Sequence, residues 1–247
     1  LTVDVSGAAG SPITYTADVT GQRTDGVGGI VRITGSDNDT TATRASCITA
    51  TSKDYRTFKG ILLDLNSTTG TIIMTTCDHW IISDCVFGTT TNTFGSIYHD
   101  GGGTDNTIDR CIFLLNRNSG IQITHSATID NTNISISNCL FIGTGTSYNH
   151  GMYISRVGGI TVKNCSFYGN ATAVFIGVAL AAGQTTTVNN CIFNTCQYGC
   201  RATALGEITE NYNSFYSNVT DRSNTSTGAN SNAYPALINP PILQDGF

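Results

Sequence analysis

Two aspartates, Asp64 and Asp100, are the residues whose type and setting could carry acid–base chemistry. Asp64 lies in "GILLDL" and Asp100 ends "IYHD", and both stretches alternate like strands. If these strands are neighbours, the carboxylates lie about 5 Å apart. That separation suits the acid and nucleophile of a retaining glycosidase. His99 adds a third catalytic candidate as a general acid or base, and two solvated aspartates are the alternative interpretation.

A glycine- and aspartate-rich stretch, "YHDGGGTDNTID", is the one candidate for metal binding. Asp100, Asp105 and Asp109 surround three glycines, and carboxylates with backbone carbonyls are calcium ligands. Calcium loops of this composition repeat in tandem, whereas this stretch occurs once, so a turn is the default interpretation. We therefore predict no cofactor, with calcium as the alternative here. No Cys-x-x-Cys pair or histidine cluster indicates zinc.

Aromatic side chains recur at one position of a repeated strand pattern. Aligning "GILLDL", "GIQITH", "GMYISR" and "TAVFIG" places one outward-facing residue in each. The predicted outward row contains Leu62, Tyr98, Gln122, Tyr153, Phe175 and Arg201. A row of aromatic rings on a rigid face could stack on sugar rings, or it could form a subunit interface. Both interpretations stay open.

These candidates depend on a repeat that runs through most of the chain. The pattern Cys-x-Phe occurs five times, and its phenylalanines are Phe87, Phe113, Phe141, Phe167 and Phe193. Weaker copies are predicted at Phe58 and Phe215. A period of about 20 to 30 residues with short strands indicates stacked coils. The sequence therefore predicts an all-β solenoid with about three strands per coil.

Stacking explains why cysteine, phenylalanine and asparagine recur. Equivalent residues of successive coils lie about 4.8 Å apart, so each repeated residue forms a column. The cysteines and phenylalanines are predicted to form internal columns, and Asn138, Asn164 and Asn190 a column of amides at a turn. Parallel side chains do not suit the disulfide torsion. We therefore expect buried free thiols in that column, with a local bridge between Cys196 and Cys200 as an alternative.

The N-C-x-F strand ends and the "NSGIQITH" and "NHGMYISR" strands resemble right-handed parallel β-helix proteins, a superfamily that includes pectate lyases, polygalacturonases and phage tailspikes. The resemblance covers residues 41–216 and implies a right-handed parallel β-helix of about seven coils. Residues 1–40 are expected to form an N-terminal cap. Residues 217–247 are expected to form an extended segment that could lead to a further domain. The calcium-aspartate row of pectate lyases and the Asp-Asp pair of polygalacturonases are not found.

Composition and the resemblance together limit the function. Only 12% of residues are charged and the net charge is -5, which disfavours a nucleic-acid partner. No apolar run reaches the roughly 20 residues of a membrane span. The favoured hypothesis is a non-catalytic structural or adhesive β-helix on a virion, as a decoration spike or tail fibre domain, or on a cell surface. Its partners would be other subunits, with a homotrimer as one form, and a surface glycan.

The second hypothesis is an enzyme, a polysaccharide lyase or glycoside hydrolase that acts on an extracellular polysaccharide. It needs a groove with acids at chemical distance. The connections around residues 88–94, 101–107 and 142–150 could form the walls of that groove. A third hypothesis is a carbohydrate-binding module without turnover. All three place the protein outside the cell or on a virion surface.

Overall fold

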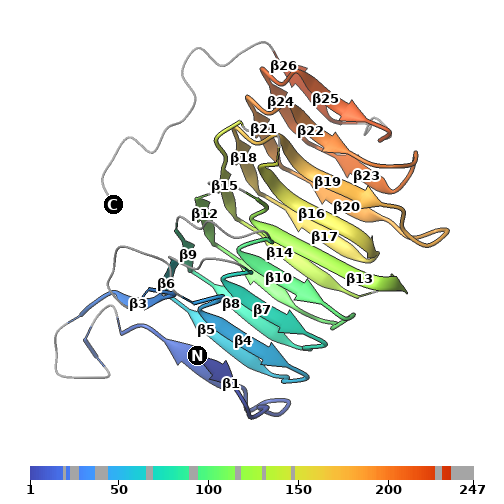
Figure 1. Ribbon diagram of the computed structural model, residues 1–247. Helices are drawn as coiled ribbons and strands as arrows, with labels where there is room; N and C mark the ends of the chain where they lie inside the picture. The colour runs from blue at the N-terminus through green and yellow to red at the C-terminus, as the bar shows by residue number, and fades with distance from the viewer. Residues whose placement is uncertain are drawn as a thin grey trace.

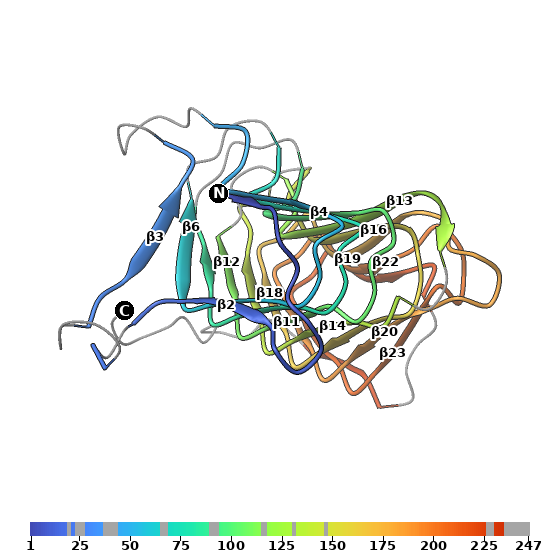
Figure 2. The same ribbon diagram turned by 90° about the horizontal axis from the view of Figure 1, so that it is seen from below.

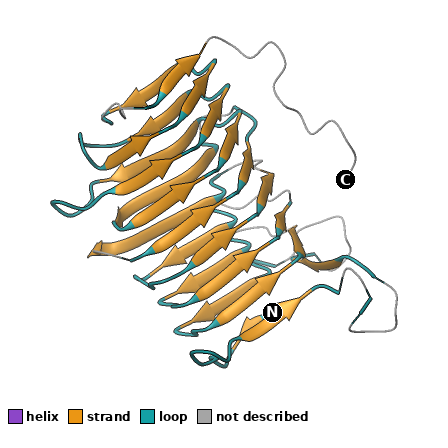
Figure 3. Cartoon of the chain, turned by 180° about the vertical axis from the view of Figure 1, so that it is seen from behind, coloured by secondary structure: helices purple, strands orange, loops and turns teal. Residues whose placement is uncertain are grey.

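The computed structural model of this chain describes residues 1–18, 21–22, 28–36, 44–64, 69–88, 94–114, 118–129, 132–145, 148–225 and 230–234. These residues form strands and turns, and none of them forms a helix that could span a membrane (Figure 3). The chain winds in coils that stack along one axis, and each coil adds one strand to each of three parallel sheets (Figure 1). The predicted right-handed parallel β-helix is confirmed.

Three sheets, here called sheets 1, 2 and 3, contain all the named strands. Sheet 1 runs in the order β1 (Thr2–Val3), β4 (Ile48–Thr51), β7 (Ile72–Thr75), β10 (Ile97–Asp100), β13 (Ile121–Ile129), β16 (His150–Val157), β19 (Thr172–Val178), β22 (Tyr198–Arg201) and β25 (Thr220–Ser223). Sheet 2 runs in the order β2 (Ile13–Thr16), β5 (Arg56–Lys59), β8 (Trp80–Ser83), β11 (Thr107–Asp109), β14 (Ile134–Ser137), β17 (Ile160–Lys163), β20 (Thr186–Asn189) and β23 (Ile208–Asn211). Sheet 3 runs in the order β3 (Val31–Thr34), β6 (Ile61–Asp64), β9 (Val86–Phe87), β12 (Ile112–Leu114), β15 (Leu140–Ile142), β18 (Ser166–Tyr168), β21 (Ile192–Asn194), β24 (Ser214–Tyr216) and β26 (Asn232–Tyr234). In the view along the axis, sheets 1 and 2 face each other and sheet 3 closes one side (Figure 2).

The number of coils agrees with the repeat. Strands β4 to β24 give each sheet seven strands among the described residues, close to the predicted seven coils. The segment 1–40, predicted as a cap, contains β1, β2 and β3, which pair in parallel with β4, β5 and β6. At the other end, β25 and β26 extend sheets 1 and 3 beyond residue 216. Residues 226–229 and 235–247 lie outside the described residues.

A column of phenylalanine rings fills the interior beside sheet 3. Phe87, Phe113, Phe141, Phe167, Phe193 and Phe215 are buried, and successive ring centroids lie 4.7 to 5.2 Å apart. The weaker copy at Phe215 therefore belongs to the column. The prediction that Phe58 begins the same column was wrong, because Phe58 lies on sheet 2. The residue of the preceding coil that pairs with Phe87 on sheet 3 is Leu63. The alternation of a strand is the same in all three sheets, so the pattern alone does not identify the sheet.

Glycines of sheet 1 pack against this phenylalanine column. A Cβ atom on Gly120 would lie 2.7 Å from the ring of Phe141, and one on Gly151 would lie 2.6 Å from the ring of Phe167. The glycine that precedes these strands in the sequence thus leaves room for a ring. This is the physical reason for the glycine that begins "GIQITH" and "GMYISR".

All nine cysteines are buried and free. In the predicted column of Cys85, Cys111, Cys139, Cys165 and Cys191, each sulfur points at two backbone carbonyl oxygens. One carbonyl belongs to the residue two positions before the cysteine, the last of a sheet 2 strand, and the other belongs to the preceding coil. The predicted free thiols are confirmed, and Cys196 and Cys200 are free as well.

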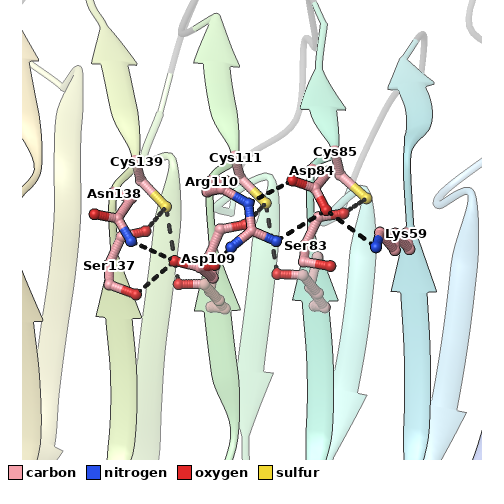
Figure 4. A network of polar contacts seen from close by, with 12 residues as sticks. Lys59, Ser83, Asp84, Cys85, Asp109, Arg110, Cys111, Ser137, Asn138 and Cys139 are labelled. Atoms are coloured by element: carbon pink, nitrogen blue, oxygen red, sulfur yellow. Dashed lines mark hydrogen bonds and ion pairs between the residues drawn. The ribbon is translucent and has the colours of Figure 1, made fainter.

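The turn between sheets 2 and 3 carries a polar ladder (Figure 4). Asp84, Arg110, Asn138, Asn164 and Asn190 have φ between 50° and 55°, the left-handed region that asparagine and aspartate tolerate best. The Asn164 amide donates to Asn138 Oδ1 at 3.3 Å, and Arg110 Nε donates to Asp84 Oδ1 at 2.6 Å. Asp84 and Arg110 therefore continue the column of asparagines as an ion pair. The hydrogen bond from Arg110 lowers the pKa of Asp84.

Candidate functional site

The outer face of sheet 1 brings five predicted residues into one row. Strand register pairs Tyr98 with Gln122, Gln122 with Tyr153, Tyr153 with Phe175 and Phe175 with Arg201. We call these five residues the aromatic row. Their side chains alternate with the buried residues of β10, β13, β16, β19 and β22 and therefore point away from the core. The register confirms that these residues are aligned, and their role in sugar binding or in an interface stays a prediction.

The rings of the aromatic row contact one another and nearby aromatics. The rings of Phe94 and Tyr98 lie 4.6 Å apart, and Tyr153 meets Phe175 edge-on at 5.6 Å. The guanidinium carbon of Arg201 lies 5.1 Å from the centroid of Phe175 and 4.9 Å from that of Tyr198. These contacts hold the side chains in fixed positions. Among the described residues, no carboxylate pairs with Arg201.

Hydroxyl groups flank the aromatic row along the same sheet. The next row pairs Thr75 with Asp100, Asp100 with Thr124 and Thr124 with Ser155, and of these four residues only Ser155 is buried. The Thr124 hydroxyl donates to Tyr98 Oη at 3.3 Å. Sheet 1 therefore combines apolar ring faces with hydroxyl donors and acceptors, which is the combination that a sugar ring needs.

His150 belongs to this site, although the sequence analysis did not place it there. Its ring lies 5.0 Å from Phe175 and 6.2 Å from Tyr153. Burial and, to a smaller extent, the positive charge of Arg201 together lower the pKa of His150 to about 4. The imidazole is therefore neutral near pH 7, and its Nδ1 atom has no hydrogen-bond partner. In the sequence, His150 directly precedes Gly151 at the start of "GMYISR", and this position could have indicated that it lies on sheet 1.

Gly177 creates the space for Tyr153. A Cβ atom at this glycine would lie 2.4 Å from Cε2 of Tyr153 and 2.7 Å from its hydroxyl oxygen. Any side chain at position 177 would therefore push the tyrosine ring out of the row. The glycine at the end of "TAVFIG" can be seen in the sequence, but only the contact with Tyr153 of the neighbouring coil shows why a glycine is needed there.

The proposed pair of Asp64 and Asp100 does not form. Asp64 ends β6 on sheet 3 and forms an ion pair with Arg32 at 3.0 Å, whereas Asp100 ends β10 on sheet 1. The prediction that Leu62 begins the row of Tyr98 was also wrong, because Leu62 lies on β6 of sheet 3. The residue that pairs with Tyr98 on the preceding strand of sheet 1, β7, is Ile73. The error came from "GILLDL", whose glycine is the turn residue before sheet 3. The two carboxylates cannot act as the paired acids of a glycosidase.

His99 is buried in the core and does not face solvent. It lies 3% exposed on the inward side of β10, and its Nε2 atom lies 3.0 Å from Asn106 Nδ2. Burial lowers the pKa of His99 to about 4. Since Asn106 donates to Nε2, the proton of the neutral ring sits on Nδ1, which has no partner. This position excludes His99 as a surface acid or base.

The three aspartates proposed for calcium lie on different elements. Asp105 is in the turn after β10, where the amide of Asn133 lowers its pKa. Burial opposes ionisation of Asp109, but hydrogen bonds from Ser137 and Asn138 lower its pKa. Within the described ranges, no three His, Cys, Asp or Glu side chains gather as a metal site. Of the proposed groove walls, residues 89–93 and 146–147 lie outside the described residues.

Comparisons with known proteins agree with this architecture. The family described as "Right handed beta helix region" matches residues 102–234, more than half of the chain. Among solved structures, an alginate lyase from Paenibacillus sp. str. FPU-7 superimposes with a TM-score of 0.54 and 13% sequence identity, over 96% of this chain and 87% of that chain. No curated protein matches significantly. At this identity the likeness shows the fold alone.

Proposed function

This chain belongs to the right-handed β-helix family, and from this premise we propose that it is a non-catalytic structural or adhesive rod that contacts a glycan. Folds of this kind host many functions, so the proposal depends on the site. The observation that carries it is the aromatic row, which ends at an Arg201 guanidinium held over two rings. Ring faces would stack on the C–H faces of sugars, and Arg201 would favour a sugar that carries a carboxylate.

The same proposal places the rod on a virion, as a spike or tail fibre domain, or on a cell surface. A stack of coils forms a straight scaffold that presents one sheet face along its whole length (Figure 1). Its partners would be other subunits of a particle or filament, with a homotrimer as one form, and a surface glycan. Two observations support this: few residues are charged, and Tyr98, Tyr153 and Phe175 lie in one row on the outer face of sheet 1.

A glycan array followed by calorimetry tests this proposal. We expect the protein to bind oligosaccharides, and Tyr153→Ala to weaken binding about fivefold, because one stacked ring contributes about 1 kcal/mol. Arg201→Gln should reduce the preference for carboxylated sugars. Thr161→Ala, an outward change on sheet 2, is the matched control and should leave affinity unchanged. No binding on the array, or equal binding by Tyr153→Ala, would contradict the proposal.

A polysaccharide lyase is the second candidate, and one arrangement favours it. Neutral His150 lies close to Tyr153 and Phe175, and Arg201 lies over Phe175. Lyase chemistry needs a base that removes a proton beside a uronate carboxyl group and a cation that stabilises the resulting charge. The alginate lyase likeness supports the scaffold but not the residues.

An assay for unsaturated sugar products separates the two candidates. Acidic and neutral polysaccharides are incubated with the wild-type protein and with His150→Ala and Asp100→Asn. The adhesive proposal expects no product from any of them. Turnover by the wild type that either substitution abolishes would establish the enzyme instead.

A further inference from the structure

A charged side chain is buried near the N-terminal end of the tube. Arg56 begins β5 on sheet 2, points into the core and is 1% exposed. Its neighbour in the next coil of that sheet is Trp80, and β5 lies close to the N-terminal end of the stack (Figure 1). A guanidinium stays protonated in proteins. The apolar core therefore contains a positive charge, which is costly away from water unless it is paired.

Among the described residues, this charge has no partner. The Nε and Nη1 atoms of Arg56 are enclosed and have no hydrogen-bond partner. None of the ion pairs of the described residues includes Arg56. Asp54, the acidic residue closest to it in the sequence, accepts from the Asp78 amide at 2.9 Å, and its carboxylate thereby supports the turn before β5. The described side chains thus leave the buried charge without a counter-charge.

The arginine at the other end of the tube shows what such a charge requires. Arg222 Nε donates to Glu210 at 2.7 Å, and the Arg222 guanidinium lies 4.2 Å from the ring centroid of Phe215. That positive charge is paired with a carboxylate of the same chain. Arg56 has no such carboxylate among the described residues, so a ligand is the remaining source of a counter-charge there.

A neighbouring coil shows where a small ligand would fit. Two coils further along, His99 of sheet 1 and Asn106 of sheet 2 meet in the core at 3.0 Å. Strand register places Ala50 in the column of His99. It also places Arg56 in the column of Asn106. The methyl group of Ala50 offers no hydrogen bond and is much smaller than an imidazole, so it leaves room beside the guanidinium.

We propose that a small monovalent inorganic anion, with the size and charge of chloride, binds the Arg56 guanidinium inside the tube. The depth of the side chain, 1% exposed, excludes a phosphorylated or carboxylated organic molecule. A single negative charge neutralises the guanidinium, whereas a divalent anion would bring a second, unpaired charge into the core. Because the unfolded chain does not form this site, the bound anion stabilises the folded state.

Thermal unfolding of the full chain in different salts tests this site. The midpoint is measured in sodium chloride, sodium bromide and sodium gluconate at equal ionic strength. We expect it to be higher by about 4 °C or more in chloride and bromide than in gluconate, whose anion is too large to enter. Equal midpoints of the wild-type protein in the three salts would overturn the proposal.

Two variants separate this site from general salt effects. Arg56→Met keeps the length of the side chain but removes its charge, and it should lose the difference between the salts. Lys163→Met removes a positive charge from the outer face of the same sheet, and it should keep the difference. The same salt dependence in Arg56→Met as in the wild type would contradict binding at Arg56.

Anomalous scattering from bromide provides a readout that does not depend on the folding of a variant. Crystals of the wild-type protein grown in sodium bromide are measured at the bromine absorption edge. We expect an anomalous peak within hydrogen-bond distance of the Arg56 guanidinium. Peaks on the outer surface alone would indicate adventitious ions only and would overturn the proposal, as would an ordered water in place of the anion.

Discussion

At the residue scale, Asn106 shows how a neighbouring coil supplies partners to a polar side chain of the interior. Asn106 accepts from the Trp80 amide at 2.8 Å and donates to Cys77 O and His99 Nε2. The neutral ring of His99 borders a cavity of about 10 Å³, at the lower limit of the volume that one water needs. A second proton would have to bind Nε2, which already accepts from Asn106, and the resulting charge would lie in the core away from water, so protonating this ring is costly.

His99 is one of two histidines, with His150, whose lowered pKa makes the stability depend on pH. The unfolded chain takes up a proton on this histidine near pH 6.5, but the folded chain does so only near pH 4. Between these values the unfolded state binds more protons, so the free energy of unfolding falls as the pH falls, by on the order of 3 kcal/mol. Urea unfolding measured from pH 4 to 7 should show a shallower pH dependence for His99→Leu. Parallel curves for the variant and the wild type would contradict the predicted pKa shift.

At the element scale, the three strands of each coil have different tasks. Sheet 3 carries the phenylalanine column inside, and sheet 1 carries the glycines that pack against those rings. Sheet 2 ends in the turn whose residues adopt positive φ and form the polar ladder. Each task requires the next coil, because the ring, the glycine and the turn residue all contact their neighbours along the axis.

The phenylalanine column predicts a large effect of one substitution. Phe141 is fully buried between Phe113 and Phe167, at 4.7 Å from each ring. Phe141→Ala should lower the free energy of unfolding by about 3–5 kcal/mol, through lost burial and the cavity that remains. Thr161→Ala, an outward change on sheet 2, should shift it by less than about 0.5 kcal/mol. Chemical denaturation measures both, and a cost below about 1 kcal/mol for Phe141→Ala would place the ring outside the core.

At the scale of the whole molecule, one continuous apolar core ends in a polar group at the C-terminal end. Glu210 continues the inward row of Val188, and its carboxylate accepts from Arg222 Nε at 2.7 Å. Arg222 lies over the last phenylalanine of the column, Phe215, at 4.2 Å. Asn213 also donates to Glu210. A buried ion pair with additional hydrogen bonds thus terminates the apolar interior and leaves its charges paired.

The enclosed core predicts unreactive thiols. Burial raises the pKa of Cys196 to about 11 and that of Cys200 well above its ordinary value. The thiolate is the reactive form, and although the hydrogen bond with Cys111 lowers the pKa of Cys85, its sulfur is as buried as the others. A chromogenic thiol reagent should therefore modify none of the nine cysteines in the native protein within minutes. All nine should react once the protein is unfolded. Rapid modification of even one native thiol would show that part of the tube opens to solvent.

The first coils show where prediction from the sequence failed. The glycine before "ILLDL" and the phenylalanine of "RTFK" matched the repeat, yet Leu62 and Asp64 lie on sheet 3 and Phe58 lies on sheet 2. All three sheets share the same alternation, so the pattern could not distinguish them. The pairing of Leu63 with Phe87 decides the assignment.

The sequence by itself determined the β-helix, the inward columns and the outward row from Tyr98 to Arg201, because spacing and alternation fix which side chains stack and which point inward. Only the tertiary structure decided that His150 joins Tyr153 and Phe175, that Gly177 makes room for the tyrosine, and that Asp64 and Asp100 lie on different sheets. Those relations depend on turn lengths and on contacts between coils, which no local pattern encodes.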